Sequence, residues 1–143
     1  MEDIVTCGSG DYGELAGIWE RSVRATHDFL SEADIASIGG LLERDYFPNV
    51  ELYALRRDGV CAGFVGLSAG KIEMLFVDSP CLGLGIGSAL MDFAKSRGAV
   101  LVDVNEQNPA ARRFYEKHGF RVVARDATDD AGRPFPILRM ALR

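Results

Sequence analysis

The chain has 143 residues, of which 48% are apolar and 26% are charged. This length predicts one domain, residues 1–143, and the composition excludes a disordered tail, a collagen and a coiled coil. The 16 basic and 21 acidic residues give a formal charge of −5. No basic run is longer than Arg56-Arg57 or Arg112-Arg113. Because nucleic-acid binders carry a clustered cationic face, we expect no nucleic-acid partner.

The cysteine content and the N-terminus indicate the compartment. Three cysteines cannot pair completely, and none lies in a CxxC motif, so we predict free thiols in a reducing compartment. The acidic start Met1-Glu2-Asp3 is unlike the basic start of a signal peptide. No stretch approaches the roughly 18–20 apolar residues of a membrane span. We therefore expect a cytoplasmic protein with no membrane partner.

The first third of the chain predicts a strand followed by two helices. Residues 4–7 form a short strand candidate, and apolar side chains recur at helical spacing over residues 11–25. Ser31 and Asp34 form a capping-box-like start for a second helix. Gly39-Gly40 weaken that helix, and Pro48 ends it.

The next segment changes to the alternating pattern of strands. Residues 52–57 alternate and lead into Asp58-Gly59, a strong hairpin signal. Residues 60–68 are the partner strand. After a turn at Ala69-Gly70, residues 71–78 form a third strand. We therefore predict a run of antiparallel strands.

The last part predicts helices between strands. A glycine-rich segment leads into a helix that begins near Ser88 and ends at Gly98. Residues 100–104 are strongly apolar, which predicts a strand covered on both faces. Asn108 caps another helix that Gly119 ends, and strands at 120–125 and 135–142 follow.

The predicted order is thus β-α-α-β-β-β-α-β-α-β-β. Helices interrupt a mostly antiparallel sheet that contains one strand–helix–strand crossover. This pattern is typical of a mixed α+β domain.

The glycine-rich segment between strand and helix suits a bound phosphate. Glycines let backbone N–H groups approach an anion, and a helix N-terminus offers free donors with a partial positive charge. A P-loop is excluded because Ser88-Ala89 follows Gly87 instead of Lys-Ser/Thr. The dinucleotide pattern GxGxxG also fails, because its sixth position is Ser88 or Leu90. The remaining alternative is a tight turn without a ligand.

Two motifs resemble signatures of the GNAT superfamily of N-acetyltransferases. The run Leu82-Gly-Leu-Gly85-Ile-Gly87 is similar to its acyl-CoA loop, Arg/Gln-x-x-Gly-x-Gly/Ala, although Leu82 replaces the usual Arg or Gln. The run from Asn108 to Phe120 resembles Asn-x-x-Ala-x-x-Phe-Tyr-x-x-x-Gly-Phe. The phrase from Arg21 to Leu30 resembles the YjaB-like branch of small bacterial acetyltransferases. The predicted element order agrees with this fold over the whole chain.

The resemblance implies acetyl-CoA as cosubstrate and direct attack by an amine in a ternary complex. Acyl-CoA would lie in a wedge where the strand containing residues 73–78 splays from strand 100–104. The backbone of Leu75 and Val77 would pair with pantetheine, and the N–H of Phe76 or Val77 would serve the oxyanion. Arg112 or Arg113 would then take over the phosphate contacts that Leu82 cannot make. The implied CoA-binding residues are Leu75, Phe76, Val77, Leu82, Gly83, Leu84, Gly85, Ile86, Gly87, Ser88, Asn108, Arg112 and Tyr115.

The catalytic groups follow from the same resemblance. Tyr115 would protonate the departing CoA thiolate, with a core tyrosine as the alternative. The base stays open between Glu73 on the key strand, His27 on the acceptor side, the weaker Glu106 and a chain of waters. No motif places a His/Asp partner beside Cys81, which disfavours a role for this residue as a nucleophile. We expect no metal site, because no ligand spacing surrounds the two histidines.

Three functions remain for comparison. The first is an acetyl-CoA-dependent N-acetyltransferase acting on a small-molecule or protein amine. The second is a noncatalytic acyl-CoA sensor of the same fold, and the third is a tRNA-acetylating toxin, which the acidic charge disfavours. The sequence does not identify the acceptor and leaves open whether the chain acts as a homodimer.

Overall fold

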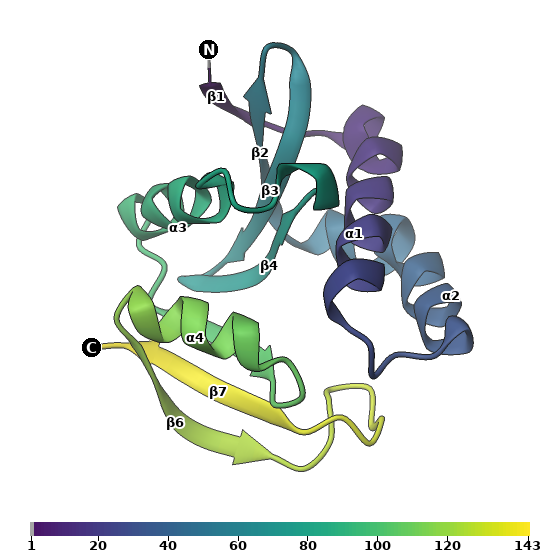
Figure 1. Ribbon diagram of the computed structural model, residues 1–143, viewed down its shortest axis with the longest axis vertical. Helices are drawn as coiled ribbons and strands as arrows, with labels where there is room; N and C mark the ends of the chain where they lie inside the picture. Colours follow the sequence, from purple (N-terminus) through teal and green to yellow (C-terminus); the bar gives the residue numbers. More distant parts are fainter. Residues whose placement is uncertain (1) are drawn as a thin grey trace.

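Seven strands form one sheet in the computed structural model, which describes residues 2–143 (Figure 1). Their order across the sheet is β1-β2-β3-β4-β5-β7-β6. The β4–β5 pair is parallel and every other pair is antiparallel, so the predicted mixed sheet is confirmed. The strands are β1 (Glu2–Thr6), β2 (Glu51–Arg57), β3 (Val60–Ser68), β4 (Lys71–Val77), β5 (Leu101–Asn105), β6 (Phe120–Asp126) and β7 (Ile137–Leu142).

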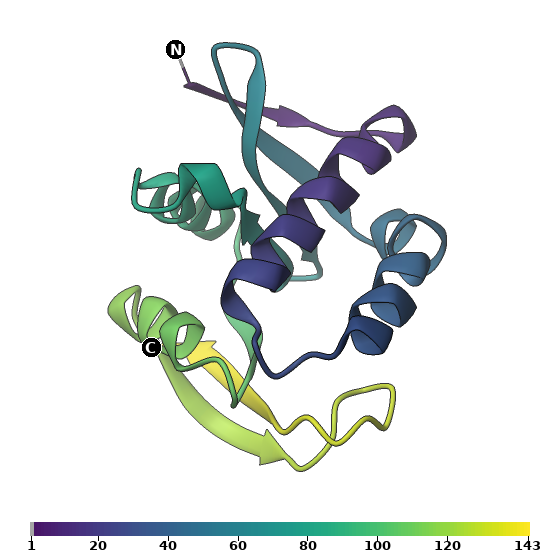
Figure 2. The same cartoon turned by 45° about the vertical axis from the view of Figure 1, so that its right-hand side comes forward.

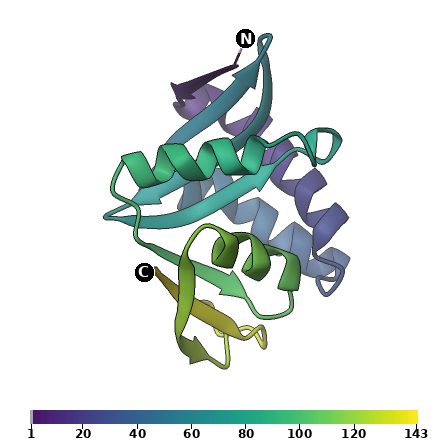
Figure 3. The same ribbon diagram turned by 60° about the vertical axis from the view of Figure 1, so that its left-hand side comes forward.

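Four α-helices cover the sheet from both sides. Figure 3 shows α3 and α4 on the near face, with α1 and α2 behind the sheet. The predicted order of helices and strands is confirmed along the chain. The helices are α1 (Tyr12–Thr26), α2 (Glu32–Leu41), α3 (Ile86–Ser96) and α4 (Pro109–Lys117).

The sheet separates two apolar cores, because side chains of a strand alternate between its faces. On β3, Val65 belongs to the core beneath α3 and α4, whereas Phe64 belongs to the core beneath α1 and α2. Leu90 and Met91 of α3 are fully buried in the first core. Phe64 meets Phe47 edge to face in the second core, with ring centroids 5.8 Å apart. Both helix pairs are therefore fixed against β3 and β4.

Two tight turns join the central strands as predicted. Asp58 and Gly59 have φ values of 53° and 82°, and Ala69 and Gly70 have φ values of 48° and 81°. Two successive positive φ angles match the right-handed twist of a hairpin. β2, β3 and β4 consequently form an antiparallel meander.

The second helix differs from the prediction at its end. The capping box of Ser31 and Asp34 is confirmed, with both reciprocal bonds at 3.0 Å. The α-helix runs through Gly39-Gly40 and ends at Leu41, before Pro48. A π-helical turn over Leu42–Tyr46 then leads to a short 3-10 turn. Gly39 suits this position because an added Cβ would lie 3.3 Å from the Trp19 ring.

The prediction that strand 100–104 is covered on both faces is wrong. Val102 and Val104 of β5 are buried, but Leu101 is 43% exposed. α1 and α2 lie against the β2–β4 half of the sheet and leave one face of β5 uncovered, whereas α4 lies over its other face (Figure 3). On the uncovered face, Asp103 forms ion pairs of 2.6 Å with both Lys71 and Arg139.

Candidate active site

A wedge opens between β4 and β5. The two parallel strands pair only at Lys71–Leu101 and Ile72–Val102, and beyond these residues they diverge (Figure 3). The opening forms a cleft of about 520 Å³ that extends to the glycine-rich loop and to α4. The predicted divergence is confirmed. It leaves one edge of β4 free for a ligand that pairs as a strand would.

A bulge and a hydrogen bond determine which way the backbone N–H and C=O groups of β4 point. Gly66 pairs with Met74 and Leu67 pairs with Ile72, so Glu73 is the extra residue of a β-bulge. The N–H of Asp78 donates to the Ala62 carbonyl of β3 at 2.9 Å.

Backbone groups alternate along a strand, which decides which of them face the cleft. Because Asp78 faces β3, Phe76 faces β3 as well. A Cβ added to Gly63 on β3 would indeed lie 2.8 Å from the Phe76 carbonyl oxygen. The backbone groups of Leu75 and Val77 therefore face the open edge, whereas those of Phe76 do not.

The glycine-rich loop lies at one end of the cleft. Gly85 adopts a φ of 80° and caps α3, which begins at Ile86. An added Cβ at Gly85 would meet no atom within 4 Å, so the backbone there is open to a ligand. Gly87 lies closer to α4, since an added Cβ would be 3.3 Å from the Phe114 ring. Together with the helix N-terminus, the loop can bind a pyrophosphate.

Leu82 and Leu84 flank this loop as exposed apolar side chains. Neither provides a charge for a phosphate. Arg112 does not line the cleft and instead lies 3.4 Å from Glu116, one turn along α4. Lys117 at the end of α4 does line the cleft. The sequence analysis missed Lys117, because its place among the variable residues of the second motif gave no signal.

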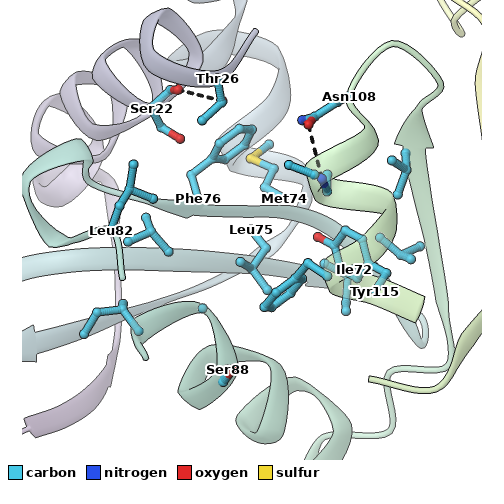
Figure 4. Close-up of a pocket in the computed structure, with 18 of the residues that line it drawn as sticks. Ser22, Thr26, Ile72, Met74, Leu75, Phe76, Leu82, Ser88, Asn108 and Tyr115 are labelled. Atoms are coloured by element: carbon cyan, nitrogen blue, oxygen red, sulfur yellow. Dashed lines mark hydrogen bonds between the residues drawn. The ribbon is translucent and has the colours of Figure 1, made fainter. Parts of the chain in front are cut away.

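α4 carries two buried polar residues into the cleft. Tyr115 is 7% exposed, and its hydroxyl points away from α4 into the cleft in Figure 4. Burial raises the pKa of this phenol, so it stays protonated at neutral pH. Asn108 is 8% exposed, and its Oδ1 caps α4 by accepting from the N–H of Ala111 at 3.2 Å. Both residues line the cleft between β4 and β5.

His27 lies at the cleft rim, immediately after α1. Its Nδ1 lies 2.7 Å from the Thr26 hydroxyl, and its Nε2 lies 3.3 Å from Nδ2 of Asn108. Burial lowers the pKa of the imidazole, and this effect is larger than the opposing effect of the Asp28 charge. Both ring nitrogens already have partners in the free protein.

Glu73 lies where two cavities meet. A second cavity of about 620 Å³ opens between the helices α1 and α2, β4 and the β6–β7 loop. Glu73, Met74 and Phe76 line both this cavity and the cleft, so β4 is the wall between them. The Glu73 carboxylate is 3.5 Å from Lys71 Nζ. A reactant in the second cavity could therefore approach a group bound in the wedge.

The β6–β7 loop borders the second cavity, and the loop after α1, which is distant in the sequence, lies against it. Figures 1 and 2 show the loop after α1 facing the loop between β6 and β7. Phe29 contacts Phe135 edge to face at 5.9 Å, and Arg133 reaches Ser37 of α2 at 3.3 Å. The sequence analysis missed this cavity, because no local motif pairs the two loops.

The other candidates have simpler surroundings. Ser88, in the first turn of α3, lines the cleft, and its hydroxyl lies 3.2 Å from Nε2 of His118. Cys81 also lines the cleft as a free thiol. Glu106 lies outside the cleft lining and is paired with Arg125 at 2.6 Å. Among residues 2–143, no cluster of three or more His, Cys, Asp or Glu could hold a metal ion.

Comparisons with known proteins assign the chain to a family. The family model of the acetyltransferase (GNAT) domain matches residues 38–142. Peptidyl-lysine N-acetyltransferase YjaB of Escherichia coli strain K12 is 41% identical over 130 residues, covering 90% of this chain and 88% of the relative. The chain belongs to the GNAT acetyltransferase family, and it is an acetyl-CoA-dependent N-acetyltransferase.

Solved structures agree with this assignment. The solution structure of apo-form YjaB from Escherichia coli matches with a TM-score of 0.90 and 36% identity, covering 99% of this chain and 97% of that one. The PaiA N-acetyltransferase of Thermoplasma acidophilum, solved with coenzyme A, shares the fold with a TM-score of 0.73 at 20% identity, covering 97% and 98% of the two chains. Across residues 2–143, no helix is long and apolar enough to cross a membrane.

Proposed function

We propose that the chain acetylates the ε-amine of lysine in a protein or peptide, by direct attack on acetyl-CoA in a ternary complex. The observation that carries this proposal is the meeting of the two cavities at Glu73, Met74 and Phe76. Acetyl-CoA in the wedge and a long, unbranched amine in the second cavity would meet across β4. The similarity to peptidyl-lysine N-acetyltransferases supports lysine as this amine.

The cleft is suited to hold acetyl-CoA along its length. The pyrophosphate would bind the loop from Gly83 to Ser88, where helix donors are free. Pantetheine would extend β4 by pairing with Leu75 and Val77 at the open edge. Lys117 supplies positive charge at the cleft that neither Leu82 nor the Glu116-paired Arg112 provides. This set is our proposal for cosubstrate binding.

The acetyl carbonyl needs a donor as negative charge develops on its oxygen. Of the two N–H groups considered, that of Phe76 faces β3, so the donor we propose is the N–H of Val77. Its position on the free edge of β4 allows it to reach a thioester in the wedge.

Proton transfers at Glu73 and Tyr115 accompany the acetyl transfer. Glu73, on the bulge between the cavities, accepts a proton from the lysine ammonium, directly or through a water. The amine then attacks the thioester carbonyl, and the C–S bond breaks as the tetrahedral intermediate collapses. Tyr115 donates its proton to the departing thiolate and regains one, through water, from the attacking nitrogen, which must lose a second proton to become the amide. Glu73 releases its proton to solvent. The products are N-acetyl-lysine and CoA.

Acetylation of matched peptides tests this acceptor assignment. We expect mass spectrometry to place one acetyl group on the lysine Nζ, with release of free CoA thiol. The same peptide with arginine in place of lysine, and with a blocked N-terminus, should give neither signal. Turnover with free small amines, but not with lysine peptides, would contradict the assignment.

A tRNA acceptor can be tested in the same assay. The formal charge of −5 disfavours a polyanionic substrate. We therefore expect no acetyl transfer to aminoacyl-tRNA under conditions in which the lysine peptide is acetylated.

A further inference from the structure

A chain of hydrogen bonds crosses the rim of the cleft from α1 to α4. On the α1 side, the Thr26 hydroxyl donates to the Ser22 carbonyl at 2.8 Å, and His27 Nδ1 lies 2.7 Å from the same hydroxyl. On the α4 side, His27 Nε2 lies 3.3 Å from Asn108 Nδ2, and Asn108 Oδ1 accepts from Ala111. Figure 4 shows the two ends, Ser22 and Thr26 on α1 and Asn108 before α4.

The donors and acceptors fix the proton on the His27 ring. Thr26 has one hydroxyl proton and gives it to the Ser22 carbonyl, so it accepts from His27 Nδ1. The Asn108 amide nitrogen can only donate, and its orientation is set because Oδ1 caps α4. His27 Nε2 must therefore accept. Only the neutral imidazole with its proton on Nδ1 satisfies all four bonds.

We propose that His27 is a positioning residue for acetyl-CoA, which holds the Asn108 side-chain amide at the cleft and does not act as the general base. The Asn108 amide has two N–H groups, and His27 accepts one of them. The second N–H is left for a carbonyl oxygen of the pantetheine arm. This inference rests on the proposed contact between Asn108 and acetyl-CoA.

The surroundings of His27 keep it neutral and in place. Ser22 and Thr26 face it from α1, and Asn108 faces it from the start of α4. The Phe29 ring lies 5.3 Å from the imidazole. Asp28 is the one charged neighbour among the described residues whose field acts on the imidazole, and burial outweighs it, so the pKa of His27 is lowered.

Protonation of His27 would break the contact with Asn108. An imidazolium carries a proton on Nε2, which would then face the N–H₂ group of Asn108. Rotating the Asn108 amide would restore that contact only by losing the cap on Ala111. Acetyl-CoA binding should therefore weaken as the pH falls through the lowered pKa of His27.

Two isosteric variants separate the functions of the two ring nitrogens. In His27→Gln, the side-chain amide reaches the position of Nε2 and can offer an acceptor to Asn108. In His27→Asn, the shorter amide reaches only the position of Nδ1. We expect His27→Gln to bind CoA like the wild type at neutral pH, and His27→Asn to raise the Kd for CoA by about three- to tenfold, the value of one hydrogen bond.

Calorimetric titration with CoA measures these Kd values without turnover. Wild-type affinity should fall on acidification below the ordinary histidine pKa of about 6.5, and the affinity of His27→Gln should change less. In an Asn108→Ala background, His27→Asn should have no further effect on the Kd. Thermal melting in each variant verifies that the protein measured is folded.

Other outcomes overturn the proposal. If His27 were the general base, both variants would lose about 10²–10⁴-fold in kcat while the Kd for CoA stayed unchanged. A purely structural histidine predicts lower melting temperatures with normal CoA affinity. If Asn108→Ala weakens CoA binding but His27→Asn does not, the positioning role fails while the proposed function stands. If Asn108→Ala leaves CoA binding unchanged, the proposed contact of Asn108 with acetyl-CoA fails.

Discussion

At the scale of single residues, Tyr115 has surroundings that suit a proton donor. Burial keeps its phenol protonated, and its hydroxyl points into the cleft. We expect Tyr115→Phe to lower kcat by at least about tenfold, because general acid catalysis contributes about 10²–10⁴-fold and water replaces part of it. The Kd for acetyl-CoA should stay within a few-fold. Steady-state kinetics and a CoA titration on the purified variant check both values.

A second tyrosine provides the control. Tyr53 packs on Phe93 outside the cleft, and its hydroxyl lies 3.4 Å from Glu51. Tyr53→Phe removes the same atom and should leave kcat unchanged. If Tyr115→Phe keeps full activity at wild-type stability, Tyr115 has no part in thiolate protonation. If it lowers the melting temperature with normal kcat, Tyr115 is a core residue only.

Leu82 replaces the cationic or amide side chain that is usual in the loop motif. It is 48% exposed, so a longer side chain can extend without a clash. We expect Leu82→Arg to tighten CoA binding by about three- to tenfold at low salt, because it adds a charge-assisted hydrogen bond that salt screens. Leu82→Glu should weaken it. S-acetylpantetheine lacks the pyrophosphate, so equal effects on its affinity would contradict this explanation.

At the scale of elements, CoA binding by the β4–α3 loop should depend more on the charge of a side chain introduced there than on its shape. Gly85 adopts a positive φ, and any L side chain there costs about 1–2 kcal/mol of strain. Gly85→Asn and Gly85→Asp are nearly isosteric and share this cost. We expect CoA affinity to fall much further in Gly85→Asp, because its carboxylate repels the pyrophosphate. Equal CoA affinities in two folded variants would show that no phosphate lies close to this residue.

The elements themselves were largely predictable, and the reasons are local. Ser31 and Asp34 predicted a capping box, and Asp58-Gly59 predicted a hairpin turn, because the bonds and φ angles involve near neighbours. The exposure of Leu101 was not predictable from its apolar run. It depends on how far α1 and α2 extend over the sheet, which is a property of packing between distant segments.

At the scale of the whole molecule, two histidines couple stability to pH. The pKa values of His27 and His118 are both lowered by burial, so the folded state binds these protons less readily than the unfolded state. Stability is therefore full above the ordinary histidine pKa of about 6.5 and decreases as the pH falls from there towards the lowered values. We expect the melting temperature to drop as the pH falls below about 6.5.

Single substitutions show how much of the pH dependence of the melting temperature each histidine contributes. His27→Gln and His118→Gln should each flatten part of the pH dependence of the melting temperature. The two contributions should add, because the residues lie in separate hydrogen-bonded groups, one with Asn108 and the other with Ser88. A melting temperature that changes equally with pH in both variants and in the wild type would show that other groups cause the effect.

The candidate site could be predicted only in part. The two family motifs located the loop and Tyr115 in the sequence, and Tyr115 and every loop residue from Leu82 to Ser88 except Leu84 line the cleft. The second cavity joins Trp19 to Arg133, and the link from His27 to Asn108 spans 81 residues. No local pattern records such pairs, so their discovery needs the folded chain. The alternation of the β4 backbone likewise depends on its pairing with β3.

The central claim is that lysine and acetyl-CoA meet across β4 and react directly. Initial rates measured over a grid of both substrate concentrations test it, together with the intact mass of the enzyme after acetyl-CoA alone. We predict intersecting double-reciprocal lines and an unmodified enzyme mass, because both substrates must be bound before the acetyl group moves. Parallel lines with one acetyl group covalently held, for example on the free thiol of Cys81, would contradict the account.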